Sequence, residues 1–341
     1  MSVNRPLNNL LVTGGSGFIG SAFIRFLLRS EFAGRIVNLD ALTYAPNPRA
    51  LDGFEQHPRY RFLHGDINNR SLVERVLLEH EIDAIVHFAA ETHVDRSIAS
   101  AMPFIETNVK GTLSLLEAVR LFPQVHFHHI STDEVYGALG ADGAFDETSP
   151  YRPNSPYSAS KAASDHLVRA YAQTYGISTT LSHCSNNYGP FQHPEKFIPL
   201  MIDRCLARKP LPVYGKGTNV RDWLHVDDHA AAIWAILQRG KRGETYDIGA
   251  SAERTNLQML SLLIELIAEE TGVNALFYHG LICYVPDRLG HDFRYAINSH
   301  KIESELGWRP QVVLKEGLRR TVRWAARHAA EFTNAVCLKQ P

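Results

Sequence analysis

The sequence of 341 residues lacks a charge excess, a cysteine pattern and a long apolar run. Lys and Arg total 35 against 36 for Asp and Glu, so no nucleic-acid partner is indicated, and an anionic substrate would need a few placed cations. No apolar run is long enough to span a bilayer, and the polar start is unlike a secretory signal. We therefore expect a cytoplasmic protein without a membrane partner. The cysteines show no metal-ligand spacing, which predicts no metal site and free thiols at Cys184, Cys205, Cys283 and Cys337.

The first half of the chain alternates short apolar runs with helical patterns. The expected strands are residues 9–13, 35–40, 61–66, 84–89 and 125–131. The expected helices between them are residues 18–29, 72–80 and 103–121. This alternation is typical of an α/β fold with a Rossmann-type, doubly wound parallel sheet.

The second half is less regular, because prolines interrupt it after residue 190. A helix at 156–175 and a strand at 179–183 come first, and the helices that follow are expected at 227–237, 257–270 and 314–327. Strands near 244–248 and 282–285 are expected to return to the main sheet or flank it. We therefore expect an NAD-binding domain over residues 8–190 that includes the catalytic residues. Residues 191–330 would form mainly a smaller, mixed substrate-binding lobe that closes over the substrate.

A glycine loop follows the first expected strand and precedes a helix. Gly14, Gly17 and Gly20 allow a tight turn and a close approach of the backbone to a pyrophosphate, which the helix N-terminus also attracts. Asp40 ends the second strand at the separation expected for a carboxylate that binds a ribose 2′-hydroxyl. The pattern predicts a dinucleotide site that prefers NAD to NADP, although Asp40 alone would also suit a turn. Residues that follow the third and fourth strands would line the same site: Asp66, Ile67, Phe88, Ala89 and Ala90.

Proton-transferring groups gather after the fifth strand. Tyr157 and Lys161 lie four residues apart, on one face of a helix, where the ammonium can lower the pKa of the phenol. Thr132 precedes two adjacent carboxyls, Asp133 and Glu134, which a simple dehydrogenase does not need. They suggest that water is moved as well as hydride. The alternative is a loop acid pair that caps a helix.

Several motifs resemble the extended short-chain dehydrogenase/reductases and, among them, the dTDP-glucose 4,6-dehydratases. The resemblance covers nearly the whole chain, and its most specific element is Thr-Asp-Glu at 132–134, since related sugar epimerases lack this acid pair. The matching segments are residues 13–21, 42–45, 87–97, 131–137, 155–161, 184–190, 194–196, 220–223 and 290–292.

The resemblance implies a mechanism and a cofactor, NAD. Tyr157, assisted by Thr132 and Lys161, would deprotonate the sugar 4-hydroxyl as C4 gives up hydride. Glu134 would then remove the C5 proton, and Asp133, held protonated, would protonate the departing 6-hydroxyl before hydride returns to C6. The implied cofactor contacts are Gly14, Gly17, Phe18, Ile19, Gly20, Asp40, Leu42, Thr43, Asp66, Ile67, Phe88, Ala89, Ala90, Thr107, Tyr157, Lys161 and Asn187.

The resemblance also implies a nucleotide-sugar substrate, dTDP-glucose. Arg221 and Arg288 would grip the diphosphate with forked donors, and Tyr214 would stack on the base. Arg221 with Asp222 could instead form a surface ion pair, and His193 and His225 are expected to be ordinary histidines. The implied substrate contacts are Thr92, Thr132, Asn186, Lys196, Phe197, Ile198, Pro212, Tyr214, Arg221, Asn256, Asp287, Arg288 and His291.

Departures from the family pattern leave the base open between dTDP and UDP. Leu289 replaces the usual Pro and Ala252 the frequent Asn near the nucleotide, while Thr92 replaces Ser and Pro46 replaces Gly. A 4-epimerase, a decarboxylase and a catalytically silent nucleotide-sugar sensor remain alternatives. By resemblance, helices 103–121 and 157–175 would pair across a homodimer, and the alternative is that both simply pack on the sheet.

Overall fold

The computed structural model describes residue 5 and residues 7–328. Cys337 and most of the polar start of the chain lie outside these residues. A seven-stranded parallel sheet forms the centre, in the order β11-β6-β5-β4-β1-β2-β3. Its strands are β1 (Asn9–Thr13), β2 (Arg35–Asp40), β3 (Tyr60–His64), β4 (Ala84–His87), β5 (His126–Thr132), β6 (Thr179–Cys184) and β11 (Thr245–Ile248). This is the expected doubly wound sheet, and its order reverses beside β1.

Helices cover both faces of the sheet, so its central strands are buried whether their residues are apolar, as in β1 and β4, or partly polar, as in β5 and β6. Leu10 on β1 packs with α1 (Phe18–Arg29) and α8 (Val226–Arg239). Leu11, the next residue, packs on the other side with α2 (Arg70–Glu79), α5 (Thr112–Val119) and α6 (Pro156–Tyr175). Since successive strand residues alternate between faces, one strand connects two cores.

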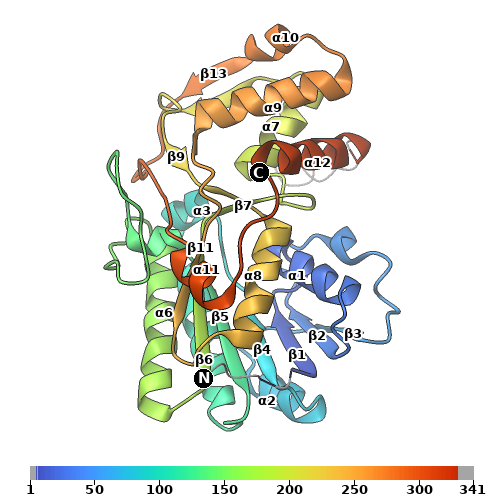
Figure 1. Ribbon diagram of the computed structural model, residues 1–341, viewed down its shortest axis with the longest axis vertical. Helices are drawn as coiled ribbons and strands as arrows, with labels where there is room; N and C mark the ends of the chain where they lie inside the picture. The colour runs from blue at the N-terminus through green and yellow to red at the C-terminus, as the bar shows by residue number, and fades with distance from the viewer. Residues whose placement is uncertain (1–4, 6, 329–341) are drawn as a thin grey trace.

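A smaller lobe stands at one end of the sheet (Figure 1). Its helices are α7 (Phe197–Leu206), α9 (Asn256–Thr271), α10 (Ala275–His279) and α12 (Leu314–Arg327). Three two-stranded sheets lie in the lobe and in the segments next to it. These pair β8 (Leu211–Tyr214) with β13 (Ile282–Val285), β9 (Val220–Arg221) with β12 (Arg254–Thr255), and β7 (Asn186–Tyr188) with β10 (Trp223–His225).

The later strands only partly follow the prediction. β11 joins the main sheet beside β6 as expected, and α8 and α11 (His300–Leu306) return with it. By contrast, β13 pairs with β8 within the lobe and takes no part in the main sheet. Near-continuous apolar character does not specify which edge a short strand will join.

Two helical predictions need correction. The helix expected over 103–121 is divided into α4 (Met102–Phe104), a π-helical segment η2 (Ile105–Gly111) and α5. The prolines after residue 190 hid α7, yet Pro199 occupies its first turn, where a missing N–H costs nothing. Five short helical elements also went unpredicted, namely η1 (Pro48–Leu51), α3 (Val94–Ala99), η3 (Asp133–Tyr136), α10 and α11. The short strands β7, β8, β9, β10 and β12 were not predicted either. Among the described residues, no helix has both the length and the apolarity to cross a membrane.

Candidate active site

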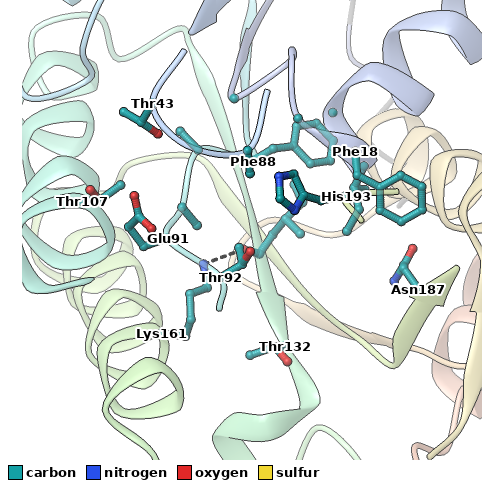
Figure 2. Close-up of a pocket in the computed structure, with 18 of the residues that line it drawn as sticks. Phe18, Thr43, Phe88, Glu91, Thr92, Thr107, Thr132, Lys161, Asn187 and His193 are labelled. Atoms are coloured by element: carbon teal, nitrogen blue, oxygen red, sulfur yellow. Dashed lines mark hydrogen bonds between the residues drawn. The ribbon is translucent and has the colours of Figure 1, made fainter. Parts of the chain in front are cut away.

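One pocket opens at the carboxyl ends of the main strands, at the point where their order reverses. The loops after β1, β2, β3, β4 and β6 line it, together with the end of β5 and the start of α6. Figure 2 shows Thr132 and Lys161 at one end of this pocket and Thr43 at the other. The pocket therefore combines the predicted dinucleotide loop with the predicted catalytic residues.

The glycine loop has the geometry that a pyrophosphate requires. Gly14 has a φ of +70°, and a Cβ there would lie 2.5 Å from the backbone N of Ala89. A Cβ on Gly20 would lie 2.4 Å from the carbonyl of Gly14, whereas one on Gly17 would meet only that carbonyl, at 3.3 Å. Gly17 provides no side-chain cap for α1, so the free N–H groups of the helix are available to an anion.

Asp40 is fixed at the other side of this loop. Its Oδ2 accepts a hydrogen bond from the Ser16 N–H at 2.9 Å, and its Oδ1 accepts one from the Leu42 N–H at 2.8 Å. The carboxylate lines the pocket, which is where a ribose hydroxyl would donate to it. The glycine cradle and Asp40 thus fit NAD.

The structure brings most predicted cofactor residues together. Leu42 differs, since its side chain is 41% exposed and only its backbone N–H serves the site, through Asp40. The predicted cofactor residues that line the pocket are Gly14, Gly17, Phe18, Ile19, Gly20, Asp40, Thr43, Asp66, Ile67, Phe88, Ala89, Ala90, Thr107, Tyr157, Lys161 and Asn187.

The acid pair lies at the end of β5 in the wall of the pocket. Asp133 begins the 3₁₀ helix η3 and is only 2% exposed, and Glu134 is partly buried. Thr132 Oγ1 accepts a hydrogen bond from the Glu134 N–H at 3.3 Å and donates one to Asp133 Oδ1 at 3.4 Å. The hydroxyl of Thr132, and not a carboxyl, caps the helix. The alternative of a capping acid pair is therefore wrong.

The two carboxyls have different electrostatic surroundings. Burial, with Glu134 and Asp222 nearby, raises the pKa of Asp133 well above its usual range. Burial also raises the pKa of Glu134, but the positive charges of Arg221, Lys196 and Arg288 oppose the rise. Asp133 is thus favoured as the protonated member, and Glu134 as the member that can hold a negative charge.

Tyr157 and Lys161 are both buried in the pocket wall, but their pKa shifts differ from the prediction. Burial and the charge of Glu134 raise the pKa of Tyr157 well above 10, and a hydrogen bond with Thr132 only partly opposes this. Burial lowers the pKa of Lys161 to about 8. The expected lowering of the phenol pKa by the ammonium is therefore outweighed, because desolvation disfavours both charged forms.

The cations expected to bind the substrate are present in the fold, and each contacts a protein group that the sequence did not predict. Lys196 lines the pocket and donates to the Thr92 carbonyl at 2.9 Å. Arg221 is 8% exposed and donates to backbone carbonyls, including that of Asp292 at 3.0 Å. Arg288 Nε lies 2.6 Å from a carboxylate oxygen of Asp95.

The surface ion pair considered for Arg221 is also wrong. Asp222 is 1% exposed and accepts hydrogen bonds from the N–H groups of Ala250 and Ala252. Arg221 itself packs over the ring of Tyr295, 4.3 Å from its centroid. Both residues of the expected surface pair are thus buried, with separate partners.

The predicted substrate residues fall into two groups. Thr92, Thr132, Asn186 and Lys196 line the pocket. The others lie outside its wall, in the lobe and the strands that join it: Phe197, Ile198, Pro212, Tyr214, Arg221, Asn256, Asp287, Arg288 and His291. Within this second group His291 Nδ1 lies 2.6 Å from an Asp287 oxygen, and its ring meets the edge of Tyr214.

Sequence reasoning missed several residues of the pocket. His193, which was expected to be a histidine without a role in the site, lines the pocket. His225 fits that expectation, because it is buried and accepts a hydrogen bond from the Asp227 N–H at the start of α8. A residue in a long loop gives no periodic signal, so only the motifs at 184–190 and 194–196 pointed to this segment. The main pocket residues that were missed are Tyr44, Glu91, Cys184, Gln192, His193 and Glu195.

Comparisons with known proteins agree with this geometry. A family model described as GDP-mannose 4,6 dehydratase matches residues 11–321. The chain is 50% identical over 340 residues to the dTDP-glucose 4,6-dehydratase of Neisseria gonorrhoeae, which covers 96% of this chain and 98% of the relative.

Two solved structures of enzymes with the same name share the fold. DesIV from Streptomyces venezuelae, solved with NAD and TYD bound, superposes with a TM-score of 0.90 at 47% identity, covering 96% of this chain and 99% of that one. The enzyme from Bacillus anthracis in complex with NAD has a TM-score of 0.88 at 44% identity, with the same coverage. The chain therefore belongs to the family of the dTDP-glucose 4,6-dehydratases.

Proposed function

We propose that this protein is an NAD-dependent hydro-lyase that converts dTDP-glucose to dTDP-4-keto-6-deoxyglucose and water. The observation that carries the proposal is that buried Asp133 and partly buried Glu134 line the same pocket as Tyr157 and the glycine loop. The relatives and the ligands named with their structures support the cofactor and the substrate class. A 4-epimerase or a decarboxylase would not need this acid pair.

The residues of the chain divide the chemistry among them. NAD, when bound, would supply the hydride acceptor that makes the sugar carbon C4 a ketone for part of the cycle. Tyr157 would accept the proton of the 4-hydroxyl as a phenolate, with Thr132 as its hydrogen-bond partner. Burial alone favours the neutral phenol, so the positive charges of Lys161 and of bound NAD would be needed to favour the ionised form.

Elimination would then use the two carboxyls separately. The C5 proton is acidic only beside a 4-ketone, and Glu134, close to three cations, can accept it as a carboxylate. Asp133, whose pKa is raised well above its usual range, would give its proton to the leaving 6-hydroxyl. A base and an acid side by side would thus remove one water molecule, after which the hydride taken from C4 would return to C6 and a proton would return to C5.

The nucleotide diphosphate would lie between the pocket and the lobe. Arg221, Arg288 and Lys196 each act on the charge of Glu134, so they form one positive region beside it. A dianionic diphosphate suits such a region in a chain of formal net charge −1. Tyr214, 39% exposed, is available to stack on the base.

A homodimer is the proposed assembly. The segment formed by α4, η2 and α5 packs along α6 and leaves apolar side chains exposed, including Met102 at 65% and Ile105 at 44%. A second copy of the same surface would cover them. Analytical ultracentrifugation should give twice the mass of the chain, and a monomer would contradict this part of the proposal.

The substrate is tested directly by comparing two nucleotides. The purified protein, without added NAD, should convert dTDP-glucose to a 4-keto-6-deoxy product, as seen by NMR, and should convert UDP-glucose far more slowly. Faster conversion of UDP-glucose would move the assignment to a UDP-glucose 4,6-dehydratase. Binding of both sugars without turnover would indicate a sensor.

A further inference from the structure

Behind the catalytic lysine lies a buried carboxylate that the chemistry above does not use. Asp165 is on α6, one turn after Lys161, and it is 0% exposed. Its Oδ2 accepts hydrogen bonds from the hydroxyls of Ser131 at 2.9 Å and Tyr151 at 3.0 Å. The same oxygen lies 3.2 Å from His183 Nε2. A buried carboxylate with this many donors is held strongly in its ionised form.

His183 lies between two carboxylates. Its other nitrogen, Nδ1, lies 2.8 Å from Oδ1 of Asp247, which also accepts a hydrogen bond from the Tyr136 hydroxyl. Burial lowers the pKa of His183, but the hydrogen bonds with Asp165 and Asp247 outweigh it and raise the pKa to about 9. Burial alone would raise the pKa of Asp165. Hydrogen bonds from His129 and His183 lower this pKa by a larger amount, so it lies below its usual value. The three groups form a carboxylate–imidazolium–carboxylate chain.

His129 connects this chain to the catalytic lysine. Its Nε2 lies 3.2 Å from Oδ1 of Asp165 and 3.4 Å from Nζ of Lys161. The imidazole is neutral near pH 7, because burial lowers its pKa to about 4. Burial pulls the pKa of Lys161 down to about 8, and Asp165 is the largest opposing influence. The same His129 nitrogen faces both groups and, in a neutral ring, can only donate to one or accept from the other, so the charge on Asp165 acts on Lys161 through space.

Other titratable groups near Lys161 do not supply a negative charge. Burial raises the pKa of the Cys184 thiol, which keeps it neutral. Burial also lowers the pKa of His87, whose ring lies 5.2 Å from that of His129, so it is neutral too. Tyr157, on the same helix, is favoured as the neutral phenol.

We propose that Asp165 is a positioning residue for the dehydration, held ionised by His183 so that Lys161 stays protonated beside Tyr157. The proposal rests on the function proposed above. It gives the buried row of charged groups a role beyond stability. A Lys161 that lost its proton near neutral pH would no longer offer a positive charge to the phenolate of Tyr157. The upper end of the active pH range would then depend on a residue that never touches the substrate.

The test is the pH profile of kcat for Asp165→Asn, measured with dTDP-glucose. Removing one opposite charge close to a buried lysine should move the alkaline limb to lower pH by about 1–3 units. KM should change little, because Asp165 does not reach the substrate. The matched control is Asp228→Asn, another buried carboxyl that accepts two backbone hydrogen bonds, from Gln311 and Val312, and its limb should stay in place.

A second variant guards against loss of folding. If Asp165→Asn unfolds, the triple variant that adds His183→Asn and Asp247→Asn removes all three charges of the buried chain and should fold. Its alkaline limb should move in the same direction, because the opposing influence of Asp165 on Lys161 is lost in it as well. An unmoved limb in a folded, active variant overturns the proposal, whereas a parent protein without dehydratase activity overturns the proposed function itself.

Discussion

At the scale of single residues, Asp133 and Glu134 differ mainly in which charges surround them. Three cations lower the pKa of Glu134. Arg221 also lowers the pKa of Asp133, but three carboxyl groups, those of Glu134, Asp222 and Asp247, raise it. The family resemblance implied the pair and a protonated Asp133. The sequence could not show the environments that separate the two pKa values, because these charges come from β9, β11 and the lobe, far along the chain. No local motif contains them.

Substitution of each carboxyl should stop the reaction at a different point. Glu134→Gln should still oxidise the 4-hydroxyl, seen as absorbance of reduced cofactor, but kcat should fall about 10²–10⁴-fold because the C5 proton stays in place. Product formation at the parent rate would show that another group is the base.

Asp133→Asn should lose the acid and keep the base. The substrate should therefore exchange its C5 proton with deuterated solvent, seen by NMR, while water is eliminated slowly. Glu134→Gln is the control, since it should show no such exchange. Equal exchange in both variants would contradict the division of roles.

At the scale of elements, α6 positions both Tyr157 and Lys161, and its start is fixed by a capping box. Ser155 Oγ accepts a hydrogen bond from the Ser158 N–H at 3.0 Å, and Ser158 Oγ accepts one from the Ser155 N–H at 3.0 Å. Tyr157 lies between them, in the first turn. Fraying of this turn would move the phenol.

Loss of the cap should therefore cost activity as well as stability. Ser155→Ala should lower the free energy of unfolding by about 1 kcal/mol and also lower kcat. The matched control is Asn274→Ala, which removes the side-chain cap of α10, the hydrogen bond that Asn274 Oδ1 accepts from the Leu276 N–H. It should cost a similar amount in denaturant unfolding and leave kcat close to the parent value. Equal loss of kcat in both variants would contradict the role of the cap.

Elements with a strong periodic signal were predicted well, and the others were not. β1 and β2 have the predicted bounds, because apolar runs buried on both faces are short and distinct. The π-helical segment η2 interrupts a helix whose composition shows no break. β13 has the predicted bounds but pairs with β8, since the choice of edge depends on how the lobe packs.

At the scale of the whole molecule, a buried charge links pH to stability. The pKa of His183 is raised from 6.5 to about 9 in the folded protein. A raised imidazole pKa stabilises the fold fully below about pH 6.5, and this contribution is lost as the pH rises through about 9.

The expected loss is of the order of 3 kcal/mol between these limits. Urea unfolding at several pH values should show stability falling between about pH 6.5 and 9. His183→Asn should flatten this part of the curve, so a parental slope in that variant would exclude His183 as its source.

The sequence predicted the doubly wound sheet and most of the cofactor pocket, because both depend on local patterns. It did not predict the partners of Arg288 and Arg221, which lie 193 and about 70 residues away along the chain. Residues that meet only when the lobe folds over the sheet leave no local signal.

The central claim is that hydride leaves C4 and returns to C6 within one closed site. The most direct measurement uses dTDP-glucose with deuterium at C4, incubated with the purified protein and followed by NMR of the product. The account predicts that the deuterium appears at C6 of the 4-keto-6-deoxy sugar. Deuterium released to solvent, or retained at C4 of an epimerised sugar, would contradict it.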